Sequence, residues 1–189
     1  MSTALRLPMD RDAFLAWENR QELRYEFDGF APVAMTGGTF AHAMIQSSLL
    51  RVLGNLLRGS PCRVVGSELK VLAAGSIRYP DAFVICSPVA RDAVLIEDPV
   101  VIFEILSPAT ATTDRIVKNR EYRATPSVQR YVLLEQIRPA ATVFTREGTD
   151  WIGRIVDADA VLALPELGID LPLAELYEGI AFPDPPEDD

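Results

Sequence analysis

The stretch Val100-Val101-Ile102-Phe103-Glu104-Ile105-Leu106 is an apolar run interrupted by one glutamate, and Ser107-Pro108 follows it. Its length and its β-branched and aromatic residues predict a buried β-strand that the proline ends. A carboxylate inside such a strand is costly unless it is paired or holds a metal ion. Glu104 is therefore the first candidate functional residue. The alternatives are an edge-strand glutamate that faces water and a partner for a buried arginine.

The residues after this strand predict how the chain continues. Thr112 or Thr113 can cap a helix that runs through Lys118 and ends at Pro126. A second fully apolar segment, 131–134, then reads as another strand. A strand, a helix and a strand in this order predict a crossover unit with two parallel strands.

The rest of the chain indicates further helices and strands around this unit. Asp10 can cap a first helix, and Asp28-Gly29 predicts a β-hairpin. We expect a long helix over about 40–58 whose buried face is formed by Ile45, Leu49, Val52, Leu53 and Leu56. Short strands are expected over 62–65, 68–73 and 77–86, a second hairpin around Gly148, and a peripheral segment over 162–176. This mixed order favours an α/β fold with a central sheet between helices.

Length and composition describe a globular domain. The chain has 189 residues, of which 49% are hydrophobic and 24% charged, so we expect one domain over 1–182 and a disordered acidic tail over 183–189. No apolar stretch approaches the length of a membrane span, and the charged N-terminus does not resemble a signal peptide. Cys62 and Cys86 are expected to be buried free thiols, which indicates a reducing cytoplasm. The net charge of −9 argues against general phosphate binding but not against a nuclease.

Two more charged residues accompany Glu104. Asp81 follows Pro80 at the start of an apolar strand, where a turn aspartate is the alternative. Lys118 lies four residues after Asp114, so a solvated ion pair is its alternative. Carboxylates at the ends of neighbouring strands suit a hard cation such as Mg²⁺. A lysine nearby could stabilise the negative charge of a phosphodiester transition state.

A resemblance rests on these residues together. The segments Tyr25-Glu26-Phe27-Asp28-Gly29, Tyr79-Pro80-Asp81-Ala82-Phe83-Val84 and Phe103-Glu104-Ile105-Leu106-Ser107-Pro108, with His42 and the Asp114–Lys118 helix, resemble the Uma-two family. That family belongs to the restriction-endonuclease-like superfamily, named for its PD-(D/E)XK motif. The similarity covers about residues 8–147. It implies a restriction-endonuclease-like mixed central β-sheet flanked by helices, with an N-terminal hairpin.

The resemblance also implies an activity and its residues. It implies a Mg²⁺- or Mn²⁺-dependent endonuclease that hydrolyses DNA phosphodiester bonds, with Asp81 and Glu104 as catalytic metal ligands. The superfamily lysine would fall at Leu106, so the resemblance implies that Lys118 takes its place. Glu26 matches the family's Tyr-Glu step and is a further catalytic candidate, or else an exposed hairpin glutamate.

Several alternatives stay open. His42 can be a base or a hydrogen-bonding residue at a helix start, and Lys70 can contact a phosphate or face solvent. The chain could be a catalytically degenerate structural or interaction module, with a homodimer as one form, or a small-molecule phosphohydrolase. No phosphate-binding glycine loop, zinc pattern or serine-hydrolase motif is present.

Overall fold

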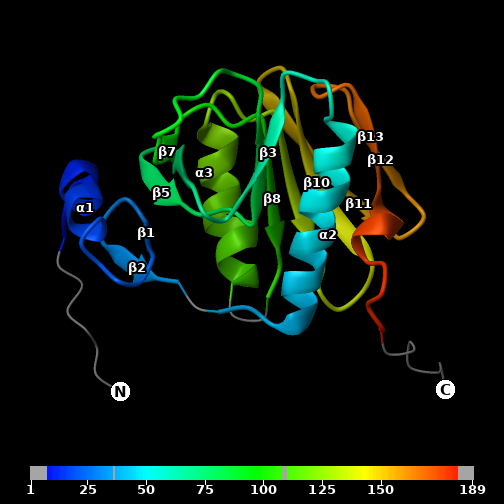
Figure 1. The fold of residues 1–189 in the computed structure, drawn as a ribbon, viewed down its shortest axis with the longest axis horizontal. Helices are drawn as coiled ribbons and strands as arrows, with labels where there is room; N and C mark the ends of the chain where they lie inside the picture. Colours follow the sequence, from blue (N-terminus) through cyan, green and yellow to red (C-terminus); the bar gives the residue numbers. More distant parts are fainter. Residues whose placement is uncertain (1–7, 36, 108–109, 183–189) are drawn as a thin grey trace.

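The structure is a computed structural model that describes residues 8–35, 37–107 and 110–182. The predicted acidic tail, 183–189, lies outside the described residues. Figure 1 shows the central sheet close to edge-on, with α3 on one side and α2 on the other. The helices of the described residues are α1 (Arg11–Glu18), α2 (Phe40–Leu56), the π-helix η1 (Thr113–Lys118), α3 (Asn119–Ala124) and the 3₁₀-helix η2 (Leu173–Leu176).

A six-stranded mixed sheet forms the centre of the molecule, in the order β11-β10-β9-β8-β6-β3. Its strands are β3 (Arg63–Gly66), β6 (Ala82–Ile85), β8 (Val101–Ile105), β9 (Arg130–Leu134), β10 (Ala140–Glu147) and β11 (Asp150–Asp157). Strand β8 pairs with β9 in parallel, and η1 and α3 connect them. The predicted crossover and the predicted hairpin around Gly148, β10–β11, are therefore confirmed.

Two smaller sheets flank the central one. The first has the order β2-β1-β5-β4-β7. It consists of β1 (Tyr25–Phe27), β2 (Pro32–Ala34), β4 (Lys70–Ala73), β5 (Ser76–Arg78) and β7 (Leu95–Ile96). The second is the hairpin of β12 (Val161–Leu164) and β13 (Ile169–Pro172). The N-terminal hairpin predicted at Asp28-Gly29 is the antiparallel pair β1–β2.

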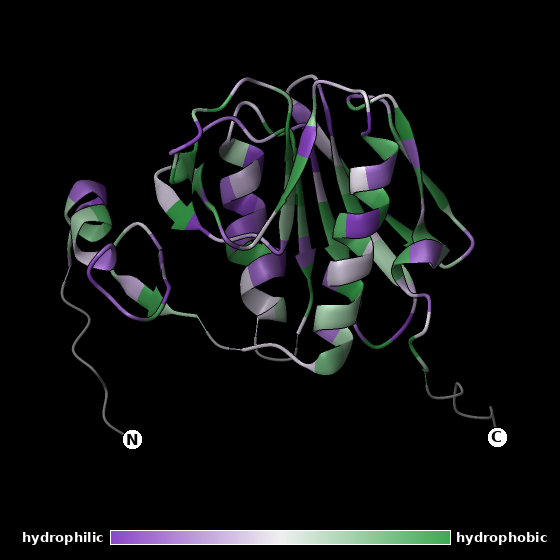
Figure 2. Ribbon diagram, in the orientation of Figure 1, coloured by the Kyte–Doolittle hydropathy of each residue, from purple (hydrophilic) through white to green (hydrophobic). Residues whose placement is uncertain are grey.

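The alternation of side chains along β8 separates two hydrophobic cores. Val101, Phe103 and Ile105 pack on the face that α2 covers, whereas Ile102 and Leu106 pack with residues of α3 and β4 on the other face. Figure 2 shows the central strands as mostly hydrophobic and the two helices as mixed. Glu104 is two residues from both Ile102 and Leu106, so it points to the face that η1 and α3 cover.

Two expectations about packing were wrong. The segment 162–176 is not peripheral, because its leucines lie in the same buried core as α2. Leu56 is 37% exposed, and Leu57 is buried instead. The buried row of α2 continues from Leu49 and Leu53 to Leu57 at a spacing of four residues, which leaves Leu56 at its edge.

The cysteines are also not free. A disulfide joins Cys62 and Cys86, whose Cα atoms are 3.9 Å apart. Cys62 precedes β3 and Cys86 follows β6, and the antiparallel register that pairs Arg63 with Ile85 places the cysteines opposite each other. We expected a reducing compartment because we expected free thiols, and the disulfide removes that reason. None of the helices in the described ranges is long and apolar enough to cross a membrane.

Replacing Leu49 tests which face of α2 is buried. Leu49 is 0% exposed, so Leu49→Ala should lower the free energy of unfolding by about 2–5 kcal/mol. Leu56→Ala is the matched control and should cost no more than about 1 kcal/mol. Urea unfolding followed by circular dichroism measures both, and equal losses in the two variants would contradict this packing.

Candidate active site

Glu104 is the centre of a buried polar cluster. Its Oε1 accepts hydrogen bonds from the Lys118 ammonium and the Tyr122 hydroxyl, each at 2.9 Å. Lys118 ends η1 and Tyr122 lies one turn later in α3, so the crossover helix presents both donors to β8. The strand glutamate neither faces water nor pairs with an arginine, because it is buried against this lysine.

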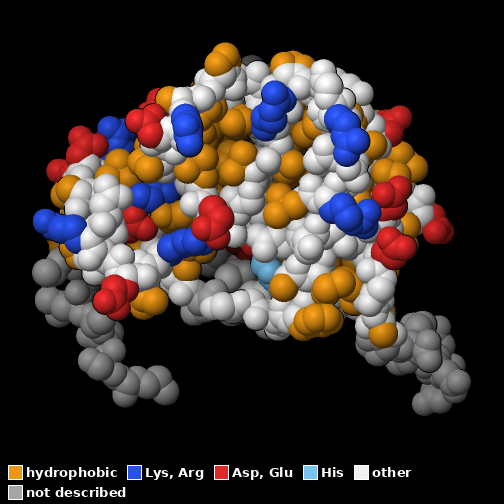
Figure 3. All heavy atoms as spheres, viewed as in Figure 1, with side chains coloured by type: hydrophobic (Ala, Val, Ile, Leu, Met, Phe, Trp, Pro, Cys, Tyr) orange, Lys and Arg blue, Asp and Glu red, His pale blue; other side chains and the backbone are white. Residues whose placement is uncertain are grey.

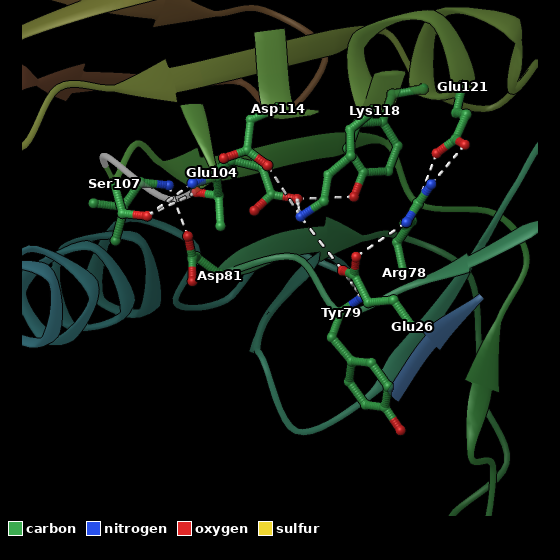
Figure 4. A network of polar contacts seen from close by, with 12 residues as sticks. Glu26, Arg78, Tyr79, Asp81, Glu104, Ser107, Asp114, Lys118 and Glu121 are labelled. Atoms are coloured by element: carbon green, nitrogen blue, oxygen red, sulfur yellow. Dashed lines mark hydrogen bonds and ion pairs between the residues drawn. The ribbon is translucent and has the colours of Figure 1, made fainter. Parts of the chain in front are cut away.

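Lys118 is shared by three carboxylates, as Figure 4 shows. Its Nζ lies 2.9 Å from Glu104 Oε1, 3.1 Å from Asp114 Oδ1 and 3.4 Å from Glu26 Oε1. The side chains of Lys118 and Asp114 are 8% and 1% exposed, so the alternative of a solvated surface pair was wrong. Lys118 is thus fixed at the site by charges from two strands and its own helix.

The π-helical turn contributes to this placement. The Asn119 N–H donates to the Asp114 carbonyl five residues earlier, and the Tyr131 hydroxyl of β9 donates to the same carbonyl at 3.0 Å. A π-turn widens the helix and is frequent at functional sites. Here it holds Asp114 and Lys118 together on the side that faces Glu104.

Glu26 reaches the cluster from the N-terminal hairpin. It is buried, and its Oε2 accepts a hydrogen bond from Arg78 Nη1 at 3.0 Å while its Oε1 accepts one from the Tyr79 N–H at 3.2 Å. Arg78 also donates to both carboxylate oxygens of Glu121, each at 2.7 Å. The alternative of an exposed hairpin glutamate was therefore wrong.

Asp81 lies beside Glu104 at the start of β6. Its Oδ2 accepts a hydrogen bond from the Ile105 N–H of β8 at 2.7 Å. His42, in the first turn of α2, places Nε2 at 3.2 Å from the same oxygen, and this hydrogen bond is the main cause that raises the pKa of His42. The chain's single histidine is visible at the surface in Figure 3 as pale blue spheres. His42 thus connects α2 to the site.

The predicted residues meet at one cavity of about 320 Å³. Its lining includes Glu26, Asp81, Glu104, Lys118 and His42. Asp114 also lines it and was not among the sequence-predicted site residues. Its spacing of four residues from Lys118 does not distinguish a buried pair from a surface one, and the resemblance, which includes this helix, assigned a role only to Lys118.

Lys70 does not belong to this cavity. Its ammonium lies 2.6 Å from Glu18 Oε2 and 3.3 Å from Asn19 Oδ1, both at the end of α1. Because Lys70 is buried in this ion pair, it neither faces solvent nor lies free for a phosphate. The ion pair between Lys70 and Glu18 connects α1 with β4.

Burial and charge shift the pKa values of the central pair. Burial raises the pKa of Glu104 well above its ordinary value. The Lys118 ammonium lowers this pKa, whereas the neighbouring carboxylates raise it further, namely those of Asp114, Asp81 and Glu26. Burial lowers the pKa of Lys118, but the attraction of Glu104, Glu26 and Asp114 outweighs it and the pKa rises. Lys118 therefore stays protonated.

The cavity carries oxygen donors of the type that hard divalent cations prefer. Glu26, Asp81, Glu104 and Asp114 supply carboxylate oxygens, and these acids outnumber the single buried ammonium among them. Asp114 Oδ1 is buried and has only its ion pair with Lys118 at 3.1 Å as a partner, without hydrogen-bond geometry. No group of three His, Cys, Asp or Glu side chains among the described residues is arranged to hold a metal. Mg²⁺ commonly uses only one or two carboxylates and keeps several waters.

The mixed sheet and its carboxylate–lysine cavity can be compared with known proteins in three ways. Residues 11–174 match the Uma2 family, described as "Putative restriction endonuclease". An uncharacterized protein of Synechocystis sp. is 30% identical over 175 residues, which cover 90% of this chain and 92% of that protein. The crystal structure of a "putative nuclease belonging to DUF820" from Anabaena variabilis superposes with a TM-score of 0.75 at 22% identity and covers 90% of this chain and 98% of that one.

The chain belongs to the Uma2 family, because the match covers most of its length. The Anabaena structure is similar in fold. The family resemblance and the restriction-endonuclease-like fold inferred from sequence are thereby confirmed. The family description supports a nuclease-like hydrolase.

Removing the Lys118 charge should destabilise the protein strongly. Lys118→Met leaves three buried carboxylates without their shared cation, and breaking a buried pair costs about 3–5 kcal/mol. The exposed Arg120→Ala, two residues further along the same helix, should change stability by less than about 0.5 kcal/mol. Chemical unfolding measures both. A loss below about 0.5 kcal/mol for Lys118→Met would contradict the burial of this ion pair.

Proposed function

We propose that this protein is a Mg²⁺- or Mn²⁺-dependent endonuclease that hydrolyses phosphodiester bonds in DNA. The observation that carries the proposal is the contact between Lys118 and Glu104 at a cavity that Asp81 also lines. These are the side-chain types that phosphodiester hydrolysis needs, namely oxygen ligands for a cation and a fixed positive charge for the transition state. The family match supports the same reaction class.

Asp81 and Glu104 would hold the cation. When bound, such a cation polarises a phosphoryl oxygen and stabilises the charge of the transition state. Glu104 shares Lys118 with Asp114 and Glu26. The ammonium therefore keeps two anionic partners even where Glu104 engages a cation, and its position is maintained.

Lys118 would act on the phosphate electrostatically. Its high pKa keeps it charged, so it serves as a fixed cation rather than as a base. A preorganised charge in a water-poor cavity stabilises developing negative charge far more than a surface charge does. Lys118 on η1 thus supplies the function of the superfamily lysine that is absent at Leu106, whose side chain packs in the core.

A catalytically degenerate module is the second candidate. The observation that favours it is the three-fold pairing of Lys118, which would serve the stability of an interaction domain equally well. Calorimetric titration with Mn²⁺ separates the two candidates. The enzyme should bind Mn²⁺ specifically and Glu104→Gln should lose that binding, whereas a degenerate site should take up none.

The first activity test replaces Asp81. Asp81→Asn keeps an oxygen that can accept the Ile105 N–H hydrogen bond, so the fold should remain while Mg²⁺-dependent cleavage of supercoiled plasmid DNA is lost. Thermal unfolding of the same preparation checks the fold. Cleavage by folded Asp81→Asn at the rate of the unmodified protein would contradict the role of Asp81.

The second activity test separates catalysis from stability with two buried lysines. Lys118→Met should lower the cleavage rate per folded molecule by about 10²–10³-fold, the typical effect of removing one transition-state donor. Lys70→Met also breaks a buried ion pair but lies outside the cavity, so its rate per folded molecule should stay unchanged. Equal rates in both variants would reject Lys118 as the catalytic lysine.

A further inference from the structure

A groove rich in arginine lies on the outer side of the crossover helix. It runs between η1–α3 and the β10–β11 hairpin, and its lining includes Arg115, Arg120, Arg123, Arg146, Asn119 and Trp151. Four guanidinium groups therefore gather in one groove of a chain whose net charge is −9. Among these four arginines, only Arg115 forms an ion pair within the described residues, with Glu135. The cluster is thus a local positive surface.

Trp151 holds two of the guanidinium groups in place. The Cζ atom of Arg146 lies 4.6 Å from the centre of the Trp151 ring, and that of Arg123 lies 5.8 Å from it. Both distances fall within the range of cation–π contacts. Arg146 Nε donates to the Val128 carbonyl at 2.8 Å, and its Nη2 donates to the Arg123 and Thr125 carbonyls at 3.0 and 2.9 Å. Arg146 is therefore fixed in the groove, with the Arg123 guanidinium beside the same ring.

The groove and the cavity share one helix. Asp114 and Lys118 line the cavity, and Arg115 and Asn119, the residues that directly follow them, line the groove. Four arginines spread along this helix and the neighbouring hairpin suit a polyanion with several phosphates better than a single small anion.

We infer that this groove binds the phosphate backbone of DNA and positions it relative to the cavity. The inference rests on the proposed nuclease function and adds a substrate-binding surface to it. Arginine is suited to this role because its planar guanidinium forms paired hydrogen bonds with phosphate oxygens. Contacts of this kind carry no base information, so the groove should bind DNA without sequence preference.

The test compares two exposed arginines of the groove with one elsewhere. Arg120→Ala/Arg123→Ala should weaken the binding of a short fluorescein-labelled DNA duplex by about tenfold or more, measured by fluorescence anisotropy in EDTA. The slope of log K against log salt should fall by about two, one for each lost phosphate contact. Arg91→Ala, an exposed arginine outside the groove, should bind as the unmodified protein does. Arg146 is left in place because it bonds three backbone carbonyls.

A spectroscopic readout locates the bound DNA. The chain has two tryptophans, so Trp17→Phe leaves Trp151 as the only one. Adding the unlabelled duplex should then change the fluorescence of Trp151 and protect it from quenching by iodide. In the double arginine variant this change should require at least about tenfold more DNA.

The outcomes separate the groove from the proposed activity. Normal DNA binding by a folded double variant, or no DNA binding by the unmodified protein, would overturn the groove inference whether or not DNA is cleaved. DNA binding that depends on the groove, in a protein that cleaves no DNA with Mg²⁺ or Mn²⁺, would support the groove and reject the nuclease. An unchanged rate on a small aryl phosphodiester in the double variant would support a role in binding alone.

Discussion

The site depends on one buried electrostatic constraint, the Lys118 ammonium among the carboxylates of Glu104, Asp114 and Glu26. Each of these charges would be costly in an apolar interior by itself. Together they connect the crossover helix with strand β8 through Glu104. They also connect the N-terminal hairpin with this helix through Glu26. The same cluster brings several carboxyl groups to the cavity, and their oxygens are the ligands that a hard cation prefers.

Glu104 was identified from sequence, because a single carboxylate within an apolar strand is costly unless it is paired or holds a cation. The crossover and both hairpins followed equally from apolar runs and turn residues. Asp81 and Lys118 were candidates from their position beside apolar segments, and the resemblance to the family assigned their roles. The structure places both at the same cavity as Glu104.

The remaining features depend on contacts between distant segments, which local patterns do not encode. Lys70 is paired with Glu18 across 52 positions, and nothing near either residue indicates the other. The Cys62–Cys86 bond follows from the register of β3 with β6. Asp114 illustrates the same limit, because spacing along a helix does not show how deeply that helix is buried.

The hairpin that carries Glu26 packs on a small core of its own, in which Phe14, Phe27 and Ile77 are the buried members. The central sheet has a much larger core on each face. Regions with few buried apolar contacts open at a lower free energy than the rest of a protein. Hydrogen exchange should therefore be faster for the backbone amides of β1 and β2 than for those of β8 and β9, which should remain protected. In the opened state the central sheet would be intact but the cavity would lack one wall, so the site would be lost while most of the fold persists.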